Sequence, residues 1–241
     1  MPVMQPTVVD VSHHNDVRDW SAVASFGIRG VVHKATQGCN PKFNDRTYAV
    51  RRARAEKAGL LWGAYHFADG SDAKAQAEHF LATVGDPAGV LLCLDWEDNP
   101  KPDGSKDRMS YKQAIEFCKI IYERTGQRPV VYGGNTLKEM IPASDTFFRE
   151  HRLWLCQYAS RPVLPRQWPS YWLWQFTGDA VGPAPHDVPG IVDHGIDLNV
   201  FGGSNLAAEW APIAGEEKPA ETADEPFVIP AADPPAPQIS T

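Results

Sequence analysis

The chain has 241 residues, of which 43% are hydrophobic and 22% are charged, and its net charge is −7 at pH 7. These values are typical of a globular protein with one sizeable core, and α/β barrels of this length commonly form a single domain. Residues 211–241 hold six acidic side chains and one basic one, so the remaining chain is nearly neutral. Because no basic face is indicated, we expect no nucleic acid as a partner.

Two further patterns limit the class of protein. The four cysteines lie far apart and form no Cys-x-x-Cys pair, which predicts neither a metal site nor a disulfide framework. No apolar run reaches the 18 residues of a membrane span, and the first residues lack the charged and then apolar segments of a signal peptide. We therefore expect no membrane insertion, and synthesis in the cytoplasm followed by release by a route that the sequence does not specify. We also expect a monomer without a cofactor.

Short apolar runs alternate with helical patterns along the first half of the chain. This alternation predicts strand–helix units and a parallel sheet. The predicted strands are 8–11, 30–36, 60–67 and 91–94, and the predicted helices are 19–25, 45–58 and 72–84. A further helix begins where Ser110 and Gln113 fit a capping box, and it stops at Gly126.

Four more apolar segments complete the set of predicted strands, at 129–132, 153–158, 171–176 and 196–201. Eight strands with helices between the early ones predict an α/β fold, a closed barrel of the (β/α)₈ kind. The later connections lack strong helical patterns, so the second half of the barrel should be irregular. We place this domain at residues 1–210. Seven of the 21 prolines fall within 211–241, among alanines and acids, which predicts a disordered tail or linker there.

The fourth predicted strand ends in two acidic residues, Asp95 and Glu97. Side chains alternate along an extended chain, so both carboxyl groups point the same way, with Cα atoms roughly 6.5 Å apart. Like charges this close resist joint ionisation, so one carboxyl group can stay protonated while the other is charged. An acid and an anion of this kind are what the cleavage of a glycosidic bond requires. Alternatively, the two side chains cap the next loop and face water.

Almost every predicted strand brings a polar residue to the same end of the barrel. In a parallel barrel the carboxyl ends of the strands form one mouth, where active sites lie. Each residue has an ordinary structural explanation when taken singly, but together they favour a site. The polar candidates are Asp10, Lys34, His66, Asp95, Glu97, Tyr132, Tyr158, Gln175 and Asp197.

Aromatic residues lie in or beside the same strand ends. Flat apolar faces next to hydrogen-bonding groups suit sugar rings. Because strand residues alternate between faces, about half of these aromatics must belong to the core instead. The aromatic candidates for sugar binding are Tyr65, Trp96, Tyr132, Tyr158 and Trp174.

Several short motifs occur in an order that resembles glycoside hydrolase family 25, which contains lysozymes of phage, bacteria and fungi. The motifs are Asp10-Val11-Ser12, Lys34-Ala35-Thr36-Gln37-Gly38, Gly63-Ala64-Tyr65-His66-Phe67, Leu94-Asp95-Trp96-Glu97, Leu153-Trp154 with Tyr158, Trp174-Gln175-Phe176-Thr177 and Asp197-Leu198-Asn199. The resemblance implies a flattened, irregular barrel. It also implies hydrolysis of the β-1,4 bond between N-acetylmuramic acid and N-acetylglucosamine in peptidoglycan.

The resemblance also implies roles for individual residues. Glu97 matches the general acid, Asp95 the carboxylate that stabilises or attacks the sugar, and Asp10 and Asp197 two further acids. Among the substrate-binding candidates, Tyr132 resembles a site aromatic. Where the family pattern is Lys-Ala-Thr-Glu-Gly, this chain has Gln37 in place of the Glu. This difference removes a charge beside Lys34.

Two mechanisms remain open. In the first, the sugar's own 2-acetamido oxygen attacks the anomeric carbon while Asp95 stabilises that group, and the configuration is retained. In the second, Asp95 is itself the nucleophile, which requires carboxyl groups about 5–5.5 Å apart. Two other functions also remain open: a non-catalytic barrel that binds cell-wall glycan, and a hydrolase directed at chitin.

Overall fold

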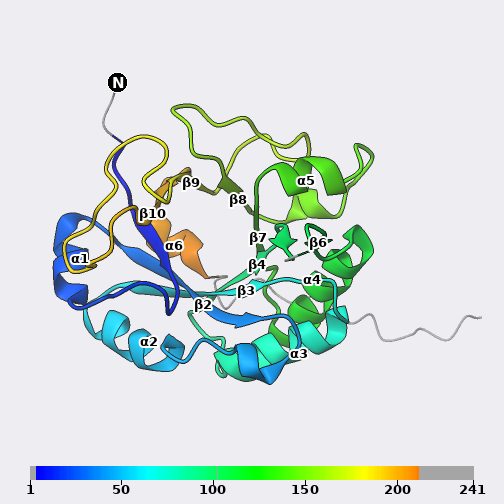
Figure 1. Ribbon diagram of the computed structural model, residues 1–241, viewed down its shortest axis with the longest axis horizontal. Helices are drawn as coiled ribbons and strands as arrows, with labels where there is room; N and C mark the ends of the chain where they lie inside the picture. The colour runs from blue at the N-terminus through cyan, green and yellow to red at the C-terminus, as the bar shows by residue number, and fades with distance from the viewer. Residues whose placement is uncertain (1–3, 102, 212–241) are drawn as a thin grey trace, which may run out of the picture.

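The computed structural model describes residues 4–101 and 103–211. The predicted tail therefore lies, apart from residue 211, outside the described residues. The remaining chain folds around one closed barrel with helices on its outside (Figure 1). Among the described residues, no helix has the length and apolar character needed to cross a membrane.

Eight strands close the barrel, in the order β1-β10-β9-β8-β7-β4-β3-β2. Their bounds are β1 Val8–Val11, β2 Gly30–Gln37, β3 Leu61–Phe67, β4 Leu91–Asp95, β7 Val130–Gly133, β8 Leu153–Cys156, β9 Leu173–Thr177 and β10 Asp197–Phe201. Each matches a predicted strand to within a few residues, so the predicted α/β barrel is confirmed.

Strand β10 differs from the expected parallel arrangement, because it runs antiparallel to both of its neighbours. A parallel strand needs a crossover that returns the chain to the other end of the barrel. Residues 178–196, which connect β9 to β10, contain no helix and make no such return. As a result, the first residue of β10, Asp197, lies at the mouth and pairs with Asp10 near the end of β1.

The helices begin and end where side chains satisfy their free backbone groups. Asp19 accepts hydrogen bonds from the first turn of α1, Asp72 caps α3, and Ser110 and Gln113 form the predicted capping box of α4. The predicted helix 45–58 begins only at Tyr48. The helices are α1 Trp20–Phe26, α2 Tyr48–Lys57, α3 Ala73–Val84, α4 Tyr111–Thr125, α5 Asn135–Met140 and α6 Leu206–Trp210, with 3₁₀ turns η1 Pro41–Phe43 and η2 Phe148–Glu150.

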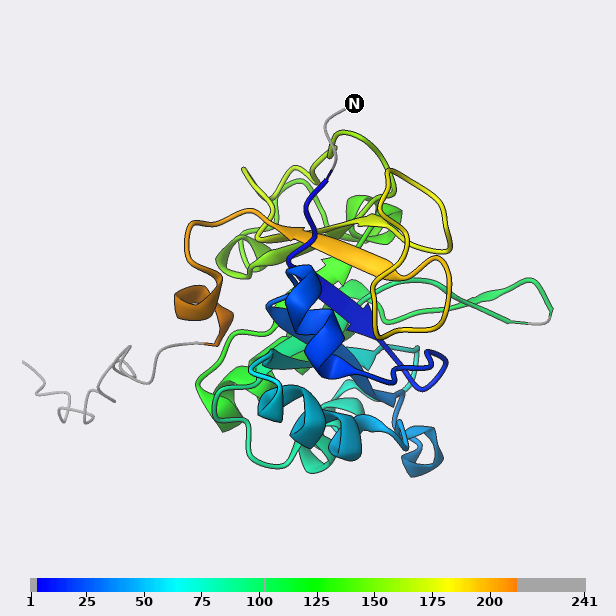
Figure 2. The same ribbon diagram turned by 90° about the vertical axis from the view of Figure 1, so that its left-hand side faces the viewer.

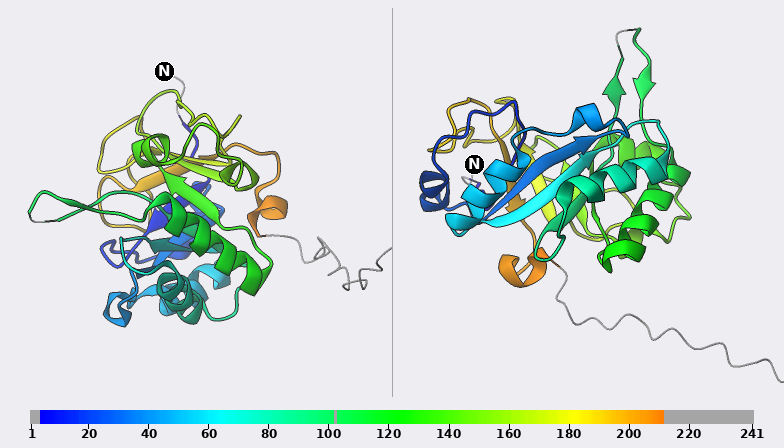
Figure 3. Two further views of the ribbon diagram at one scale, coloured as in Figure 1. Left: turned by 90° about the vertical axis from the view of Figure 1, so that its right-hand side faces the viewer. Right: turned by 90° about the horizontal axis from the view of Figure 1, so that it is seen from below.

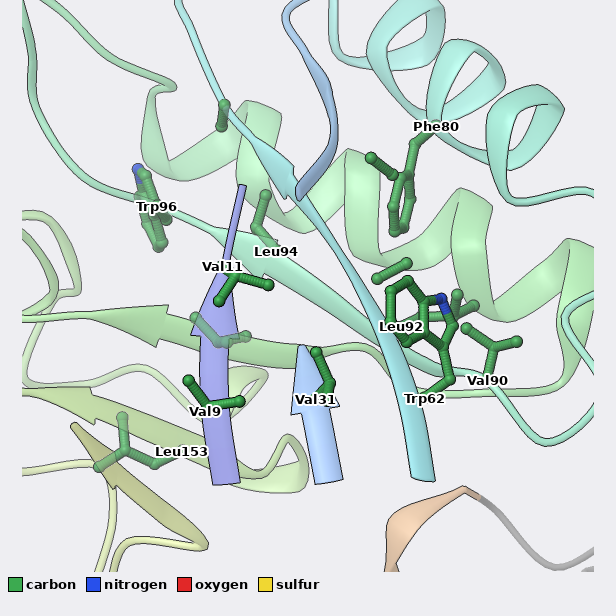
Figure 4. Packing of buried hydrophobic residues seen from close by; sticks show 14 of the residues in the cluster. Val9, Val11, Val31, Trp62, Phe80, Val90, Leu92, Leu94, Trp96 and Leu153 are labelled. Carbon is green, nitrogen blue, oxygen red and sulfur yellow. The ribbon is translucent and has the colours of Figure 1, made fainter. Parts of the chain in front are cut away.

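Alternation along the strands divides the core into two layers. The outer layer lies between the barrel and its helices, where Val9, Leu92 and Leu94 pack in one cluster with Phe80 of α3 (Figure 4). The inner layer fills the barrel, and it includes Val8, Leu91, Cys93, Tyr132 and Trp154. Alternate residues of each strand face the inside and the outside of the barrel, and only the side chains that face inward can reach the mouth.

Helix α6 lies at the end of the barrel away from the mouth. Its Trp210 is 1% exposed and donates its indole N–H to the carbonyl of Trp62 at 2.8 Å. The ring belongs to the inner layer and lies against Gly30, where a Cβ atom would be 2.6 Å from it. Glycine at position 30 is thus required by the close approach of the Trp210 ring.

A two-stranded hairpin, β5 (Asn99–Pro100) and β6 (Lys106–Asp107), projects from the body directly after the acidic strand. It extends on the side opposite α6 (Figures 2 and 3). Ion pairs hold its base, with Lys106 2.5 Å and Arg108 3.0 Å from the carboxyl group of Asp98. The sequence does not predict this hairpin, because two-residue strands carry no hydrophobic alternation.

Candidate active site

Four carboxyl groups meet at the mouth of the barrel. Asp95 is the last residue of β4 and Glu97 follows two residues later, while Asp10 and Asp197 are paired across β1 and β10. Asp10 and Asp95 are only 7% and 5% exposed. The neighbours Val8 and Cys93, two residues before Asp10 and Asp95, belong to the inner layer, which shows that these acids point inward.

Asp10 is held by side chains from the adjacent strand β10 and from β9, the strand next to it. Gln175 donates from Nε2 to both of its oxygens at 3.0 Å, and Asn199 donates from Nδ2 at 2.7 Å. The amide oxygen of Asn199 accepts the indole N–H of Trp154 at 2.6 Å. Because an indole nitrogen only donates, this bond fixes the Asn199 amide with its NH₂ group toward Asp10. The Tyr132 hydroxyl donates to Gln175 Oε1 at 2.8 Å.

Asn199 and Trp154 belong to the sequence motifs but are not among the predicted site residues. Alternation gives the signal that would have found Asn199, because it lies two residues after Asp197 on the same face of β10. Nothing in the sequence indicates that the Trp154 indole supports that amide, since the contact joins residues 45 positions apart.

Burial raises the pKa of every acid in this group. The pKa of Glu97 rises to about 7 and that of Asp10 to about 7, although hydrogen bonds from Asn199 and Gln175 favour the charged form of Asp10. Burial and the charge of Asp10 raise the pKa of Asp197 to about 9. The four groups therefore share fewer than four negative charges near neutral pH.

Asp95 has the least compensated environment of the four acids. Burial and the charge of Glu97 raise its pKa well above the ordinary value, and the charge of Lys34 acts in the opposite direction. Its Oδ1 is buried and accepts no hydrogen bond from any residue that the structure describes. A buried oxygen without a donor is costly unless something else supplies one, so this atom is suited to a donor on a bound molecule.

Lys34 supplies the positive charge of the site. Its ammonium group donates to Gln37 Oε1 at 2.7 Å and lies 4.7 Å from the ring centroid of Phe67. Burial lowers its pKa, while the charges of Asp95 and Glu97 act to keep it protonated. Gln37 thus bonds Lys34 without neutralising it.

Three predicted aromatic contacts line or support this mouth. Tyr65 and Tyr132 point into the barrel, where each packs edge-on against Trp154. The Tyr158 hydroxyl donates to Asp197 Oδ1 at 3.5 Å. Gly178 lies against both Tyr158 and Asp197, so that even a methyl group there would displace the Asp197 carboxyl group.

The structure corrects the predicted substrate-binding role of His66. Its side chain points away from the barrel interior, is 0% exposed, and stacks on Phe117 of α4. Its two ring nitrogens bond Thr36 Oγ1 at 2.7 Å and Gln76 Oε1 at 3.0 Å. Burial lowers the pKa of His66 to about 3, so it is a neutral core residue.

Trp96 and Trp174 are corrected for the same reason, because both belong to the outer layer. The Trp96 indole donates to the carbonyl of Met109 at 2.8 Å, and the Trp174 indole donates to that of Gln157 at 2.8 Å. Trp96 lies between two inward-facing acids in the sequence, so the alternation of side chains along the strand already indicates that it faces outward.

Comparison with known proteins identifies the family. Residues 9–183 match the family model described as glycosyl hydrolases family 25. The chain belongs to this family. Family 25 membership makes it a glycoside hydrolase. The match covers β1 to β9 and includes Asp10, Asp95 and Glu97, whereas Asp197 follows its last residue.

Curated relatives and solved structures agree with this assignment. Lysozyme M1 of Streptomyces globisporus is 28% identical over 208 residues, which cover 81% of this family 25 chain and 67% of the relative. The uncharacterized protein YegX of Escherichia coli O6:H1 is 30% identical over 204 residues, which cover 81% and 69%. The bacterial lysozyme from Streptomyces coelicolor has a TM-score of 0.72 at 28% identity, covering 84% of this chain and 95% of its own. A muramidase from Trichobolus zukalii has a TM-score of 0.69 at 27% identity, covering 84% and 97%.

Proposed function

We propose that this family 25 enzyme is a muramidase that hydrolyses the β-1,4 bond between N-acetylmuramic acid and N-acetylglucosamine in peptidoglycan. The observation that carries this proposal is the pair of carboxyl groups at the end of β4. Glu97, with its pKa raised to about 7, stands beside Asp95, which has an unpartnered buried oxygen. The relatives described as lysozyme and muramidase support the choice of substrate. Peptidoglycan lies outside the cytoplasmic membrane, so the proposal includes action there.

Glu97 is the general acid in this proposal. A pKa near 7 keeps a substantial fraction of its carboxyl group protonated at neutral pH, so that it can donate a proton to the glycosidic oxygen. The bond between that oxygen and the anomeric carbon then breaks, and the leaving sugar departs with the proton. Burial is the largest cause of the raised pKa, and the nearby charge of Asp98 adds to it.

Asp95 acts on the 2-acetamido group of N-acetylmuramic acid, the sugar whose anomeric carbon reacts. As the glycosidic bond breaks, the acetamido carbonyl oxygen attacks the anomeric carbon and forms a cyclic oxazolinium ion. The free Asp95 Oδ1 accepts the N–H of this group and offsets its positive charge. Water then attacks the anomeric carbon and gives up a proton to the Glu97 carboxylate, while the bond from that carbon to the acetamido oxygen breaks. This step restores the acetamido group and the protonated Glu97, and the sugar keeps its original configuration.

Asp10 and Asp197 set the charge of the site. Asp10 accepts three N–H bonds, which favour its charged form against the burial that raises its pKa to about 7. The raised pKa of Asp197 makes it a protonated neighbour that can donate a hydrogen bond to a sugar hydroxyl. Tyr65, Tyr132, Tyr158, Gln175 and Lys34 line the remaining wall and position the glycan.

Digestion of purified peptidoglycan, followed by reduction with borohydride, tests the proposed bond. New muramitol ends are expected. Glucosaminitol ends would contradict the muramidase proposal in favour of a glucosaminidase, and no new ends would favour a barrel that only binds glycan. Chitin oligomers assayed in parallel should be cleaved poorly, and faster cleavage of chitin than of peptidoglycan would overturn the choice of substrate.

The role of Asp95 is tested separately with a slow substrate. After acid quenching, mass spectrometry of the peptide that contains Asp95 should show no sugar attached, because the acetamido oxygen forms the new bond. A covalent Asp95–sugar adduct would instead establish the direct nucleophile.

A further inference from the structure

A cavity of about 310 Å³ lies beside the proposed catalytic site, and it is lined by His13 and by residues of β2 and of the segment that follows β2. This volume falls at the lower end of the range of small-ligand pockets. Lys34 belongs to both sites, because it lines the cavity and its charge acts on Asp95 and Glu97. The cavity therefore adjoins the acidic mouth through the Lys34 side chain.

The cavity carries unpaired positive charge. Lys34, Lys42 and Arg46 line it, and within the described part of the chain none of the three forms an ion pair. The nearest polar partner of Lys34 is the neutral amide of Gln37. An anionic group that enters this cavity could pair with any of these three cations without disrupting an existing salt bridge.

The one acid that lines the cavity is already engaged. The Asp45 side chain is 0% exposed and its Oδ1 accepts from the backbone N–H and the hydroxyl of Thr47, at 2.8 Å and 2.7 Å. Its Oδ2 accepts the backbone N–H of His13 at 2.7 Å and lies 3.0 Å from the His13 ring nitrogen. Asp45 therefore anchors the wall of the cavity. Its charge acts on Lys34, but it forms no ion pair with Lys34, Lys42 or Arg46.

The wall of the cavity is also held in place before anything binds. The η1 turn is capped by Asn40, whose side chain accepts the N–H of Lys42 at 3.0 Å. Asn44 is bridged to Thr36 of β2, and His79 of α3 bonds the carbonyl of Gly38 at 2.7 Å. Figure 2 shows this turn on the same side of the barrel as the β5–β6 hairpin. A preformed site loses less entropy on binding than a flexible one.

We propose that this cavity binds a carboxylate of the peptide attached to N-acetylmuramic acid, and so makes the enzyme prefer peptide-bearing strands. This inference rests on the proposed muramidase function. The peptide is attached to the sugar through the lactyl group. Its first two residues, L-alanine and D-glutamate, place a free carboxylate within about 7 Å of that group, which is the reach of two extended residues. Lys42 and Arg46 are the specificity-determining cations, and the exposed Phe43 ring offers an apolar edge to the peptide.

The test uses two defined tetrasaccharides of alternating N-acetylglucosamine and N-acetylmuramic acid. One carries L-alanyl-D-glutamate with free carboxylates, and the other carries the same dipeptide with those carboxylates converted to amides. The wild-type enzyme is expected to show a kcat/KM at least about tenfold higher on the carboxylate form. In the double variant Lys42→Gln/Arg46→Gln this ratio should fall close to one, mainly through a higher KM on the carboxylate form.

A matched control removes the same charge elsewhere. Lys112→Gln/Lys119→Gln changes two exposed bases of α4, far from the cavity in sequence and lining a different surface, and it should keep the wild-type ratio. Equal cleavage of both substrates by the wild type, or an equal loss on both in the double variant, would overturn the proposal. Failure to cleave either substrate would contradict the proposed muramidase function instead.

Discussion

At the scale of residues, Trp154 orients Asp10 indirectly, through the amide group of Asn199. Asn199 has only one usable amide orientation, because Trp154 donates to the amide oxygen. Removing the indole N–H leaves that oxygen buried without a donor, at a cost of about 1–3 kcal/mol, and frees the amide to turn. Trp154 is thus a positioning residue for a carboxylate that it does not touch.

Trp154→Phe is therefore expected to move the acid-side limb of the pH–rate profile to higher pH, with a drop of several-fold in kcat. The reason is that Asp10 loses a bond that favours its charged form. The profile of kcat/KM against pH checks this result. Trp174→Phe is the control, because that indole also donates to a single acceptor, the carbonyl of Gln157, but lies in the outer layer. An unchanged limb in Trp154→Phe would contradict the positioning role.

At the scale of elements, the β5–β6 hairpin is connected by Asp98 to Glu97, the proposed general acid. The Asp98 carboxylate adds to the raised pKa of Glu97, while Lys106 and Arg108 pair with Asp98 at the base of the hairpin. Glu97 must be protonated to act as the acid, so activity should fall as pH rises through a value near 7.

Asp98→Asn is expected to move this alkaline limb to lower pH. The substitution removes a negative charge that raises the pKa of Glu97, and it leaves Lys106 without its ion pair while Arg108 keeps its pair with Glu139. The same pH–rate measurement on Asp103→Asn, near the tip of the hairpin, should show the wild-type limb. A limb that stays in place or moves upward in Asp98→Asn would refute the coupling.

The elements also show how far the sequence predicts the site. Alternation and strand ends located Asp10, Asp95, Glu97 and Asp197, because apolar runs mark strands and acids mark their ends. The direction of β10 was not predicted, since it depends on a long connection without a helical pattern. His66 was assigned to the mouth because Tyr65 and His66 are both plausible site residues, and only the packing of β3 against α4 decides which one faces inward.

At the scale of the whole molecule, the acid cluster should cost stability above acidic pH. The folded protein holds protons on these carboxyl groups more tightly than the unfolded chain does. The unfolded chain therefore binds fewer protons between the ordinary pKa near 4 and the raised values. Stability must then fall as pH rises through this window, which for Asp197 extends to about 9.

Asp197→Asn is accordingly expected to raise the melting temperature at pH 8 more than at pH 5, while lowering activity. Each kcal/mol recovered corresponds to roughly 2–4 °C in a domain of this size. Thermal unfolding at the two pH values measures the difference, with Glu116→Gln on the exposed face of α4 as the control. A melting temperature that falls equally at both pH values would show that Asp197 stabilises the fold as a charged group.

The most direct test of the central claim, that Glu97 donates the proton that breaks the glycan, is the number of muramitol ends formed from one peptidoglycan preparation by wild type and by Glu97→Gln. The wild type is expected to form them rapidly. Glu97→Gln should form them about 10²–10⁴-fold more slowly while still sedimenting with the cell wall, because the amide keeps the shape of the site but has no acidic proton. A Glu97→Gln enzyme that cleaves at the wild-type rate would contradict the claim.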